Sequence, residues 1–386
     1  MFSKKFGKKR YLFITTIIVV SIILFLSFTR FKSPMPTQAN YSKEYIEKNR
    51  GKVVVEIPEV YELANIAIAI SDYGLKDPYH VNKQSLYYKQ VLKHFLPFKK
   101  HPLIRKIDEL LNVDGKSAYM KSVLNYYRFR DNSACYVFKG NSIVPGGIYP
   151  EIWSPDLFKK YIKLVEDFAK VTQFRKFYQD NLPYYQEQIQ KYKEEVPVRK
   201  MWVWLERNFP ERYDCYKIIF SPLIGCSHCT KRFESKGFKE IVMFISGPGV
   251  YKKSSGKVRE GLLSRIVFTE IDHNYVNPIT ERYSNRVSKA FSDVEKWNKQ
   301  SGYCSPFGTF NEYMTWAVFT LYAYDNYNER DFKAINQIVV YEMVKSRKFV
   351  LFKQFDEKLL ELYLNRKKGE TIPDLYPKIL EWAEKM

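Results

Sequence analysis

The stretch Thr269-Glu270-Ile271-Asp272-His273 places a carboxylate and an imidazole at positions i and i+3 of a helical segment. Side chains at that spacing project from the same side of a helix. In the zinc-protease motif H-E-x-x-H, two histidines bind zinc and the glutamate acts as general base. Thr269 replaces the first histidine, and a hydroxyl is not among the usual protein ligands of zinc. The stretch therefore predicts a catalytic base at Glu270 and a metal ligand at His273.

The apolar setting of Glu270 and His273 requires a partner for both side chains. Leu263, Ile266 and Val267 lie on the same side of the predicted helix, one to two turns earlier. Burying an unpaired charge costs several kcal/mol. A divalent metal ion is one candidate partner, and an arginine from a neighbouring helix is the other. The sequence leaves both open, together with the interpretation of a buried structural helix.

A second acidic side chain, Glu312, could complete a metal site. It lies in the segment NEYMTWAVFTLYAY, on a helix face that it shares with Trp316 and Phe319. A glutamate from the helix that follows the motif would supply a further zinc ligand. The alternative interpretation is a first-turn glutamate that is favoured by the helix dipole.

The loop Cys226-Ser227-His228-Cys229 offers the imidazole that Thr269 lacks. The predicted zinc ligands are therefore His273, Glu312 and His228, although a polar loop histidine is the simpler interpretation of His228. One C-x-x-C without a second pair is weak evidence for zinc. A local disulfide between Cys226 and Cys229, or two inert thiols, is expected instead. The chain has five cysteines, so at least one thiol stays outside any intramolecular pair.

The elements that must position these side chains divide the chain after residue 51. Residues 52–207 are mostly helical, after a short strand at Lys52–Ile57 and a helix that Pro58 opens. Residues 208–350 hold two β-rich runs, YDCYKIIFSPL and KEIVMFISG, which the cysteine-containing loop joins. Residues 351–386 are predicted to form C-terminal helices. The predicted class is α+β, rich in helix, with a small sheet beside the T-E-I-D-H helix.

The T-E-I-D-H helix is predicted to run from Gly256 to Tyr275. Asn277 precedes Pro278, and a residue before proline is pushed away from the α region. The dipeptide is therefore expected to end the helix. Asn277 and Asp272 are included in the candidate site because they border its two main side chains.

The first fifty residues predict a membrane anchor. Residues 1–10 form a basic tail, and residues 11–29 are nineteen uncharged residues, enough to cross about 30 Å of hydrocarbon as a helix. The basic residues before this segment predict a cytoplasmic N-terminus and a single-pass bacterial membrane protein whose main domain lies outside the cytoplasm. A cleaved signal peptide is the alternative. Residues 30–51 are expected to form a linker.

The charge balance argues against nucleic acid as a partner. The 63 basic and 42 acidic residues give a net charge of +21. Seven of the basic residues lie within the first 32 positions, where no acidic residue occurs. The others are scattered among acidic residues and form no basic stripe. Attraction to anionic lipid or envelope polymers beside the anchor explains the excess more simply.

The chain resembles the family called domain of unknown function 4932, which groups exported proteins mainly of Bacteroidota-type bacteria. The resemblance extends over about residues 55–345 and is carried by IPEVYELANIAIAI, IIFSPLIGCSHCTKRF, FTEIDHNYVNP and FNEYMTWAVFTLY. It implies a zincin-like fold and a metallopeptidase. Glu270 would match the base, His273 a zinc ligand and Glu312 the downstream acidic position. Thr269 departs from the first-ligand position.

Three functions are consistent with these residues. The first is a membrane-anchored, extracytoplasmic, zinc-dependent hydrolase that acts on peptides or proteins. The second is an inactive pseudo-peptidase that serves as an envelope binding or scaffold protein, for which Thr269 is the main evidence. The third is a carbohydrate- or polymer-binding surface protein, suggested by 31 tyrosines. Tyrosines at helical spacing more often fill the core and the contacts between helices.

Overall fold

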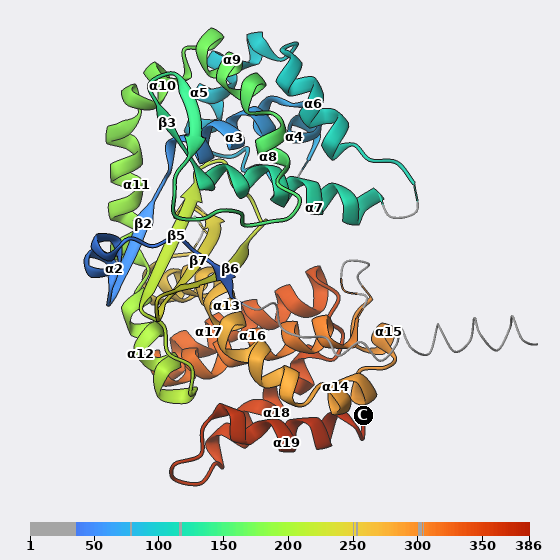
Figure 1. Cartoon of the computed structure of the whole chain (residues 1–386). Coiled ribbons are helices and arrows are strands. Elements are labelled where there is room, and N and C mark those ends of the chain that lie inside the picture. Colours follow the sequence, from blue (N-terminus) through green and yellow to red (C-terminus); the bar gives the residue numbers. More distant parts are fainter. Residues whose placement is uncertain are drawn as a thin grey trace, which may run out of the picture.

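The computed structural model describes residues 36–77, 79–115, 118–249, 251, 254–299, 303 and 305–386. The predicted anchor at residues 11–29 lies outside this part of the chain. Within it, no helix combines the length and the apolar character that a membrane span requires. A central sheet separates a helical N-terminal region from a helical C-terminal region (Figure 1).

The central sheet has five strands in the order β1-β6-β7-β5-β2. Their bounds are β1 Thr37–Gln38, β2 Lys52–Glu56, β5 Cys215–Ser221, β6 Cys229–Ser235 and β7 Phe238–Ser246. The strands β2, β5 and β7 run parallel, β6 is antiparallel to β7, and β1 is parallel to β6. A parallel pair needs a crossover connection, and helices supply it between β2 and β5. The prediction of a small sheet in a helix-rich fold is confirmed, but the class is α/β and not α+β.

Four strands were missed by the sequence prediction: β1 and β6 of the central sheet and the two strands of a hairpin within residues 136–145. The segment between the two β-rich runs was expected to be a loop, yet its second half forms β6. Six of the seven β6 residues are partly exposed, because the strand lies near the edge of the sheet. The polar sequence CTKRFES therefore lacks the apolar pattern of a buried strand.

The N-terminal region is mainly helical, as predicted. Its helices are α2 Lys43–Asn49, α3 Glu59–Ile70, α4 Asp72–Lys76, α5 Leu86–Phe95, α6 Pro102–Leu111, α7 Ala118–Arg130, α8 Leu157–Lys160, α9 Ile162–Val171, α10 Phe174–Asp180, α11 Leu182–Glu195 and α12 Val198–Asn208. The 3-10 turns η1 Leu96–Phe98 and η2 Asn132–Cys135 and a hairpin of β3 Tyr136–Lys139 and β4 Ser142–Pro145 complete it.

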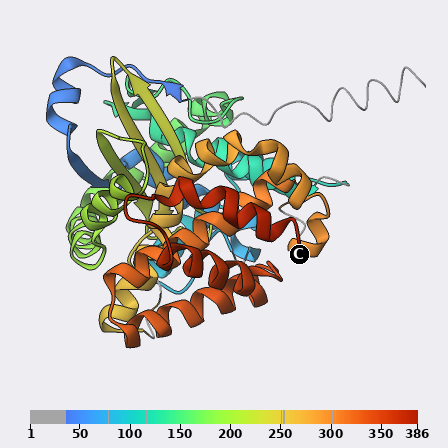
Figure 2. The ribbon, with the colours of Figure 1, turned by 90° about the horizontal axis from the view of Figure 1, so that it is seen from below.

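The C-terminal region consists of helices that pack on one another. They are α13 Gly256–Arg282, α14 Ser284–Ala290, α15 Val294–Trp297, α16 Pro306–Asn326, α17 Glu329–Tyr341, the π-helical turn η3 Glu342–Ser346, α18 Phe352–Leu364 and α19 Ile372–Ala383. Helix α16 packs against α13, α17 and α18, and α18 packs against α19. Figure 2 shows these helices, orange to red, side by side under the sheet.

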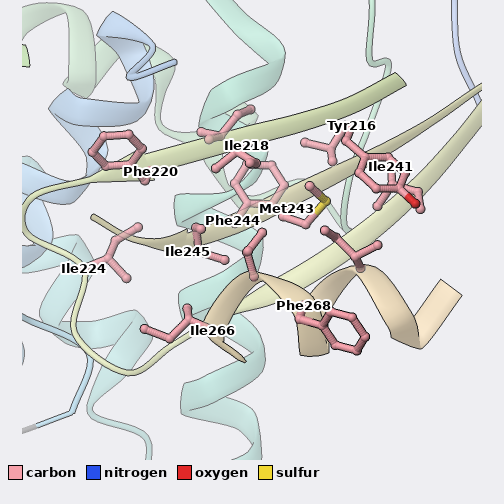
Figure 3. Packing of buried hydrophobic residues seen from close by; sticks show 14 of the residues in the cluster. Tyr216, Ile218, Phe220, Ile224, Ile241, Met243, Phe244, Ile245, Ile266 and Phe268 are labelled. Atoms are coloured by element: carbon pink, nitrogen blue, oxygen red, sulfur yellow. The ribbon is translucent and has the colours of Figure 1, made fainter. Parts of the chain in front are cut away.

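The core lies on both faces of the central strands. Every residue of β5 is buried, and so are all residues of β7 except Lys239. The register pairs Ile218 with Met243, so both point to the same face. On that face they meet Ile266 and Phe268 of α13 (Figure 3). The opposite face packs against α3. A sheet covered on both faces holds α13 firmly in place.

Helix α13 runs unbroken through Pro278, so the predicted end at Tyr275 is wrong. A proline inside a helix lacks the amide hydrogen that would bond the carbonyl four residues earlier. That carbonyl belongs to Asn274, and the Tyr213 hydroxyl donates a hydrogen bond to it at 2.8 Å. Because a side chain supplies the missing donor, the helix continues to Arg282.

Part of the expected linker is packed structure. We call residues 36–51 the N-terminal strap. Tyr41 and Tyr45 of the strap donate hydrogen bonds of 2.9 and 2.8 Å to the fully buried carboxylate of Glu240 on β7. The Tyr149 hydroxyl donates a third hydrogen bond to it. The strap thus supplies hydrogen-bond donors to an acidic side chain that is buried in the core, where unbonded polar groups are costly.

We predict that Tyr213→Phe destabilises the protein and that the cost depends on Pro278. In the native chain the Asn274 carbonyl would lose its donor, which costs about 1–3 kcal/mol. In a Pro278→Ala background the alanine amide can bond that carbonyl, so Tyr213→Phe should cost much less. Denaturant unfolding of the four proteins of this double-mutant cycle measures the difference. Equal costs in both backgrounds would contradict the explanation given for the unbroken helix.

Candidate active site

One side of α13 is partly open to solvent in an otherwise buried stretch. Glu270, His273 and Asn277 are partly exposed, whereas Thr269 and residues 274–276 are buried. The spacing of three, then four residues places these side chains along one line of the helix. The side chains predicted from T-E-x-x-H therefore form one partly exposed site on the helix, which we call the α13 site.

His273 is bonded through both of its ring nitrogens. Nε2 lies 3.4 Å from Oε1 of Glu312 on α16, and Nδ1 lies 3.3 Å from Oδ1 of Asn277. Burial would lower the pKa of His273, but the hydrogen bond to Glu312 and the charges of Glu312 and Glu270 raise it above its ordinary value. The raised pKa favours the protonated ring, in which both nitrogens can donate.

Glu312 is held by two cations. Its Oε2 accepts a hydrogen bond of 2.7 Å from the Arg347 guanidinium, while Oε1 faces His273. Burial would raise the pKa of Glu312, but Arg347 and His273 together lower it to about 2. Glu312 is the seventh residue of α16, so the interpretation as a first-turn glutamate is wrong. Both carboxylate oxygens are engaged in ion pairs.

A tryptophan holds the guanidinium that binds Glu312. The Cζ atoms of Arg347 and Arg265 lie 4.7 and 4.5 Å from the centre of the Trp316 ring. Such contacts are attractive because the face of the ring carries negative charge. Arg265 is also paired with Glu342 at 3.2 Å, and it donates a hydrogen bond to the Tyr251 hydroxyl. The two arginines are therefore fixed by charge and by stacking.

Thr269 bonds to its own helix and does not take the position of a metal ligand. Its side chain is buried, and its hydroxyl donates to the carbonyl of Arg265 at 3.1 Å, with the Ile266 carbonyl 3.4 Å away. Threonine hydroxyls often bond in this way to the preceding turn of their own helix. The first-ligand position of H-E-x-x-H is thus filled by a group that satisfies the backbone.

Glu270 is the acidic side chain of the α13 site whose pKa lies near neutral pH. Burial raises the pKa of Glu270 to about 7, and the charge of Glu312 adds to this, although His273 and the two arginines oppose it. A group with a pKa near the working pH can take up or release a proton easily. Glu270 therefore has the property expected of a base, whether or not a metal is bound beside it.

Asp272 behaves differently from its two neighbours. It is fully buried, and neither of its carboxylate oxygens has a hydrogen-bond partner. Burial raises the pKa of Asp272 well above its ordinary value, and the charges of Glu270 and Glu312 act in the same direction. Burial therefore favours the uncharged form of this side chain.

His228 is not bonded to the other predicted ligands. Its Nε2 lies 3.2 Å from the Ser246 hydroxyl at the end of β7. Burial lowers the pKa of His228 to about 3, and the charges of Arg265 and Arg130 lower it further, so the ring is neutral. Tyr127 donates a hydrogen bond to its carbonyl at 3.2 Å, which ties the loop to α7.

Cys226 and Cys229 are free thiols and not the predicted disulfide. Cys226 is exposed, whereas Cys229 begins β6 and directs its sulfur to Asp131, with Sγ 3.1 Å from Oδ2. The two thiols therefore lie in different environments and share no bond. Cys304, the fifth cysteine, lies outside the described residues.

The residues were compared with the needs of zinc, which takes three or four protein ligands. His273 and Glu312 face each other, but the hydroxyl of Thr269 is engaged by the backbone and His228 is bonded to Ser246. In the part of the chain that the structure describes, no three or more His, Cys, Asp or Glu side chains converge on a metal position. Of the predicted ligands, the described structure brings His273 and Glu312 together.

The sequence found one half of this site and missed the other. The α13 site does bring together four predicted residues, Glu270, His273, Asn277 and Glu312. Arg347 was not predicted, although an arginine from a neighbouring element was one of the two partners left open. It lies 35 positions after Glu312, beyond a π-helical turn, and no spacing rule connects the two. Tyr303, which bonds Arg347, was missed for the same reason.

Comparison with known proteins gives one match. The family described as Domain of unknown function (DUF4932) matches residues 53–382. No curated protein and no solved structure matches the chain. The expected family is therefore confirmed over most of the chain, while the description of that family names no activity.

We predict that Glu312→Gln lowers the pKa of His273, because it removes the main cause that raises it and leaves the burial that lowers it. Glu342→Gln is the matched control, since it removes a partly buried ion pair to Arg265 and leaves Glu312 in place. Histidine signals followed by NMR against pH, with His273→Ala for assignment, give the values. An unchanged His273 in Glu312→Gln would contradict the proposed ion pair.

The same pair sets a window in the stability of the protein. The raised pKa of His273 means that its contribution is complete below its ordinary value of 6.5 and is lost as the pH rises through the higher folded value. The lowered pKa of Glu312 means that its contribution is complete above 4.5 and is lost as the pH falls toward about 2. The stability difference between wild type and Glu312→Gln should therefore be largest between these limits.

Proposed function

We propose that this chain, which belongs to the DUF4932 family over residues 53–382, is a binding protein that holds a polypeptide segment at the α13 site without a catalytic metal. This is the pseudo-peptidase alternative of the sequence analysis. With the predicted anchor at residues 11–29, the protein would act outside the cytoplasm at the bacterial membrane.

One observation carries the proposal: Arg347 binds the residue that would be a metal ligand. The guanidinium lies 2.7 Å from Glu312, and the His273 ring lies 3.4 Å from its other oxygen. A metal ion would have to displace a stacked, hydrogen-bonded arginine and remove a proton from His273. Two internal cations thus neutralise Glu312 where a peptidase of this type would use zinc.

The edge of the sheet near the α13 site is the reason for proposing a polypeptide ligand. Thr230 on β6 accepts a hydrogen bond of 3.0 Å from Asn274 of α13, so this end of the strand lies beside the helix that carries the site. The amide of Ala39, directly after β1, donates a hydrogen bond to the carbonyl of Glu234, and main-chain groups of alternate residues point to the same side of a strand. The main chain of Thr230 therefore faces the outer edge of β6, where the described residues of β1 pair with Phe233 and Glu234. An extended peptide could add to this edge.

A metal-dependent hydrolase is the second candidate, and two observations favour it. Glu270 has a pKa near 7, as a general base would require, and His273 does face Glu312. Zinc remains a prediction of the sequence for this candidate. Because the described residues do not supply three ligands, no catalytic step is assigned to them.

The proposal predicts that the soluble region, residues 36–386, retains extended peptides from a mixed library without cleaving them. Thr230→Pro should weaken binding, because it removes the main-chain donor on the outer edge, where proline is tolerated. Thr230→Ala is the control, since it keeps that donor and loses only the hydroxyl. Retention by affinity selection and cleavage by mass spectrometry are measured together. Cleavage that Glu270→Gln abolishes would overturn the proposal in favour of the hydrolase.

A further inference from the structure

A second candidate site lies on the outer surface of the C-terminal region. A groove of about 390 Å³ runs along α17, η3 and the start of α18. Val340, Val344 and Val350 are its partly buried lining, whereas Tyr341, Lys345 and two glutamines are exposed around them. This volume is in the range of small-molecule sites. A protein partner would need a much larger surface.

The polar groups around the groove favour an anion. Lys345 and Lys353 line it, and no acidic side chain does. Among the described residues Lys345 has no ion pair, and Lys353 has only an exposed contact of 3.8 Å with Glu357. Such exposed pairs contribute little. The Tyr341 hydroxyl and the glutamine amides can also donate hydrogen bonds. Valines below donors and cations suit a molecule with an apolar chain and an anionic end.

The π-helical turn connects this groove to the α13 site. The groove is lined by Val344 and Lys345 of the turn and by Tyr341 directly before it, whereas Glu342 of the turn forms an ion pair with Arg265 of α13. Arg347 follows the turn directly, and its amide closes it with a hydrogen bond of 2.9 Å to the Glu342 carbonyl. π-helical turns are rare and occur frequently at functional sites. A shift of this five-residue turn would therefore move both the groove lining and the guanidinium that holds Glu312.

We propose that the groove binds an alkyl carboxylate and that its occupation shifts Arg347 relative to Glu312. The carboxylate would lie between Lys345 and Lys353, and the alkyl chain would cover the three valines. Binding of the alkyl carboxylate at the groove does not depend on the function proposed for the α13 site. The regulatory consequence does, because a change at Arg347 alters the site in which the polypeptide is held.

Binding is tested with decanoate, using decanol and decylamine as probes that share its chain and differ in the head group. Saturation-transfer and titration NMR on residues 36–386 should show decanoate binding and much weaker binding of the other two. Replacing both lysines, in Lys345→Gln/Lys353→Gln, should weaken decanoate about tenfold, because charged hydrogen bonds are lost. Lys333→Gln, on the same helix α17 and exposed, is the control and should change nothing. Equal binding of decanol, or of the double variant, would overturn the anion site.

Coupling is tested in the same titration through the imidazole signals of His273. Decanoate should shift these signals in the wild type and leave them unchanged in the double lysine variant. Decanoate binding that leaves His273 unchanged in the wild type would overturn the coupling. The result is separate from the proposed function: zinc bound at His273, or peptide cleavage, would refute that function without altering decanoate binding to the groove.

Discussion

The arrangement of the α13 site depends on the neutralisation of the Glu312 carboxylate by neighbouring cations. Its carboxylate lies where α13 meets α16, among buried aromatic side chains, and a charge in that place must be paired. Arg347 and His273 provide the pairing, and each is itself held by other groups: Arg347 by Trp316, and His273 by Asn277. The requirement explains why an arginine from a distant part of the chain belongs to this site.

The rigidity of α13 keeps these groups together. The helix lies against a sheet whose central strands are buried on both faces, and it continues past Pro278 because Tyr213 bonds the carbonyl that proline leaves free. Asn277 and His273 can then occupy successive turns of one helix and bond to each other. The strap has a similar role at the start of β7, where its two tyrosines donate hydrogen bonds to the buried Glu240. Buried polar groups with assigned partners define this fold as much as its apolar core does.

Much of the fold could be predicted from the sequence, because it follows local patterns. The runs that became β2, β5 and β7 are rich in β-branched and aromatic residues, and Glu270 and His273 share a helix face by simple spacing. What could not be predicted depends on contacts between distant segments. Strand β6 is polar because it lies near a sheet edge, and the Tyr213 bond that rescues the helix joins positions 61 residues apart. Arg347 is a further case, since a single arginine after a helix carries no mark of its partner.

The most direct test of the account is the zinc content of residues 36–386 after incubation with zinc and removal of the excess, by elemental analysis. Wild type, Thr269→His, and Thr269→His/Arg347→Gln are compared. The account predicts no bound zinc in wild type, little in the single variant, and close to one zinc per chain only when the ligand is restored and the competing guanidinium is removed. About one zinc per chain in wild type, lost in His273→Ala, would contradict it and would mean that a metal completes this site after all.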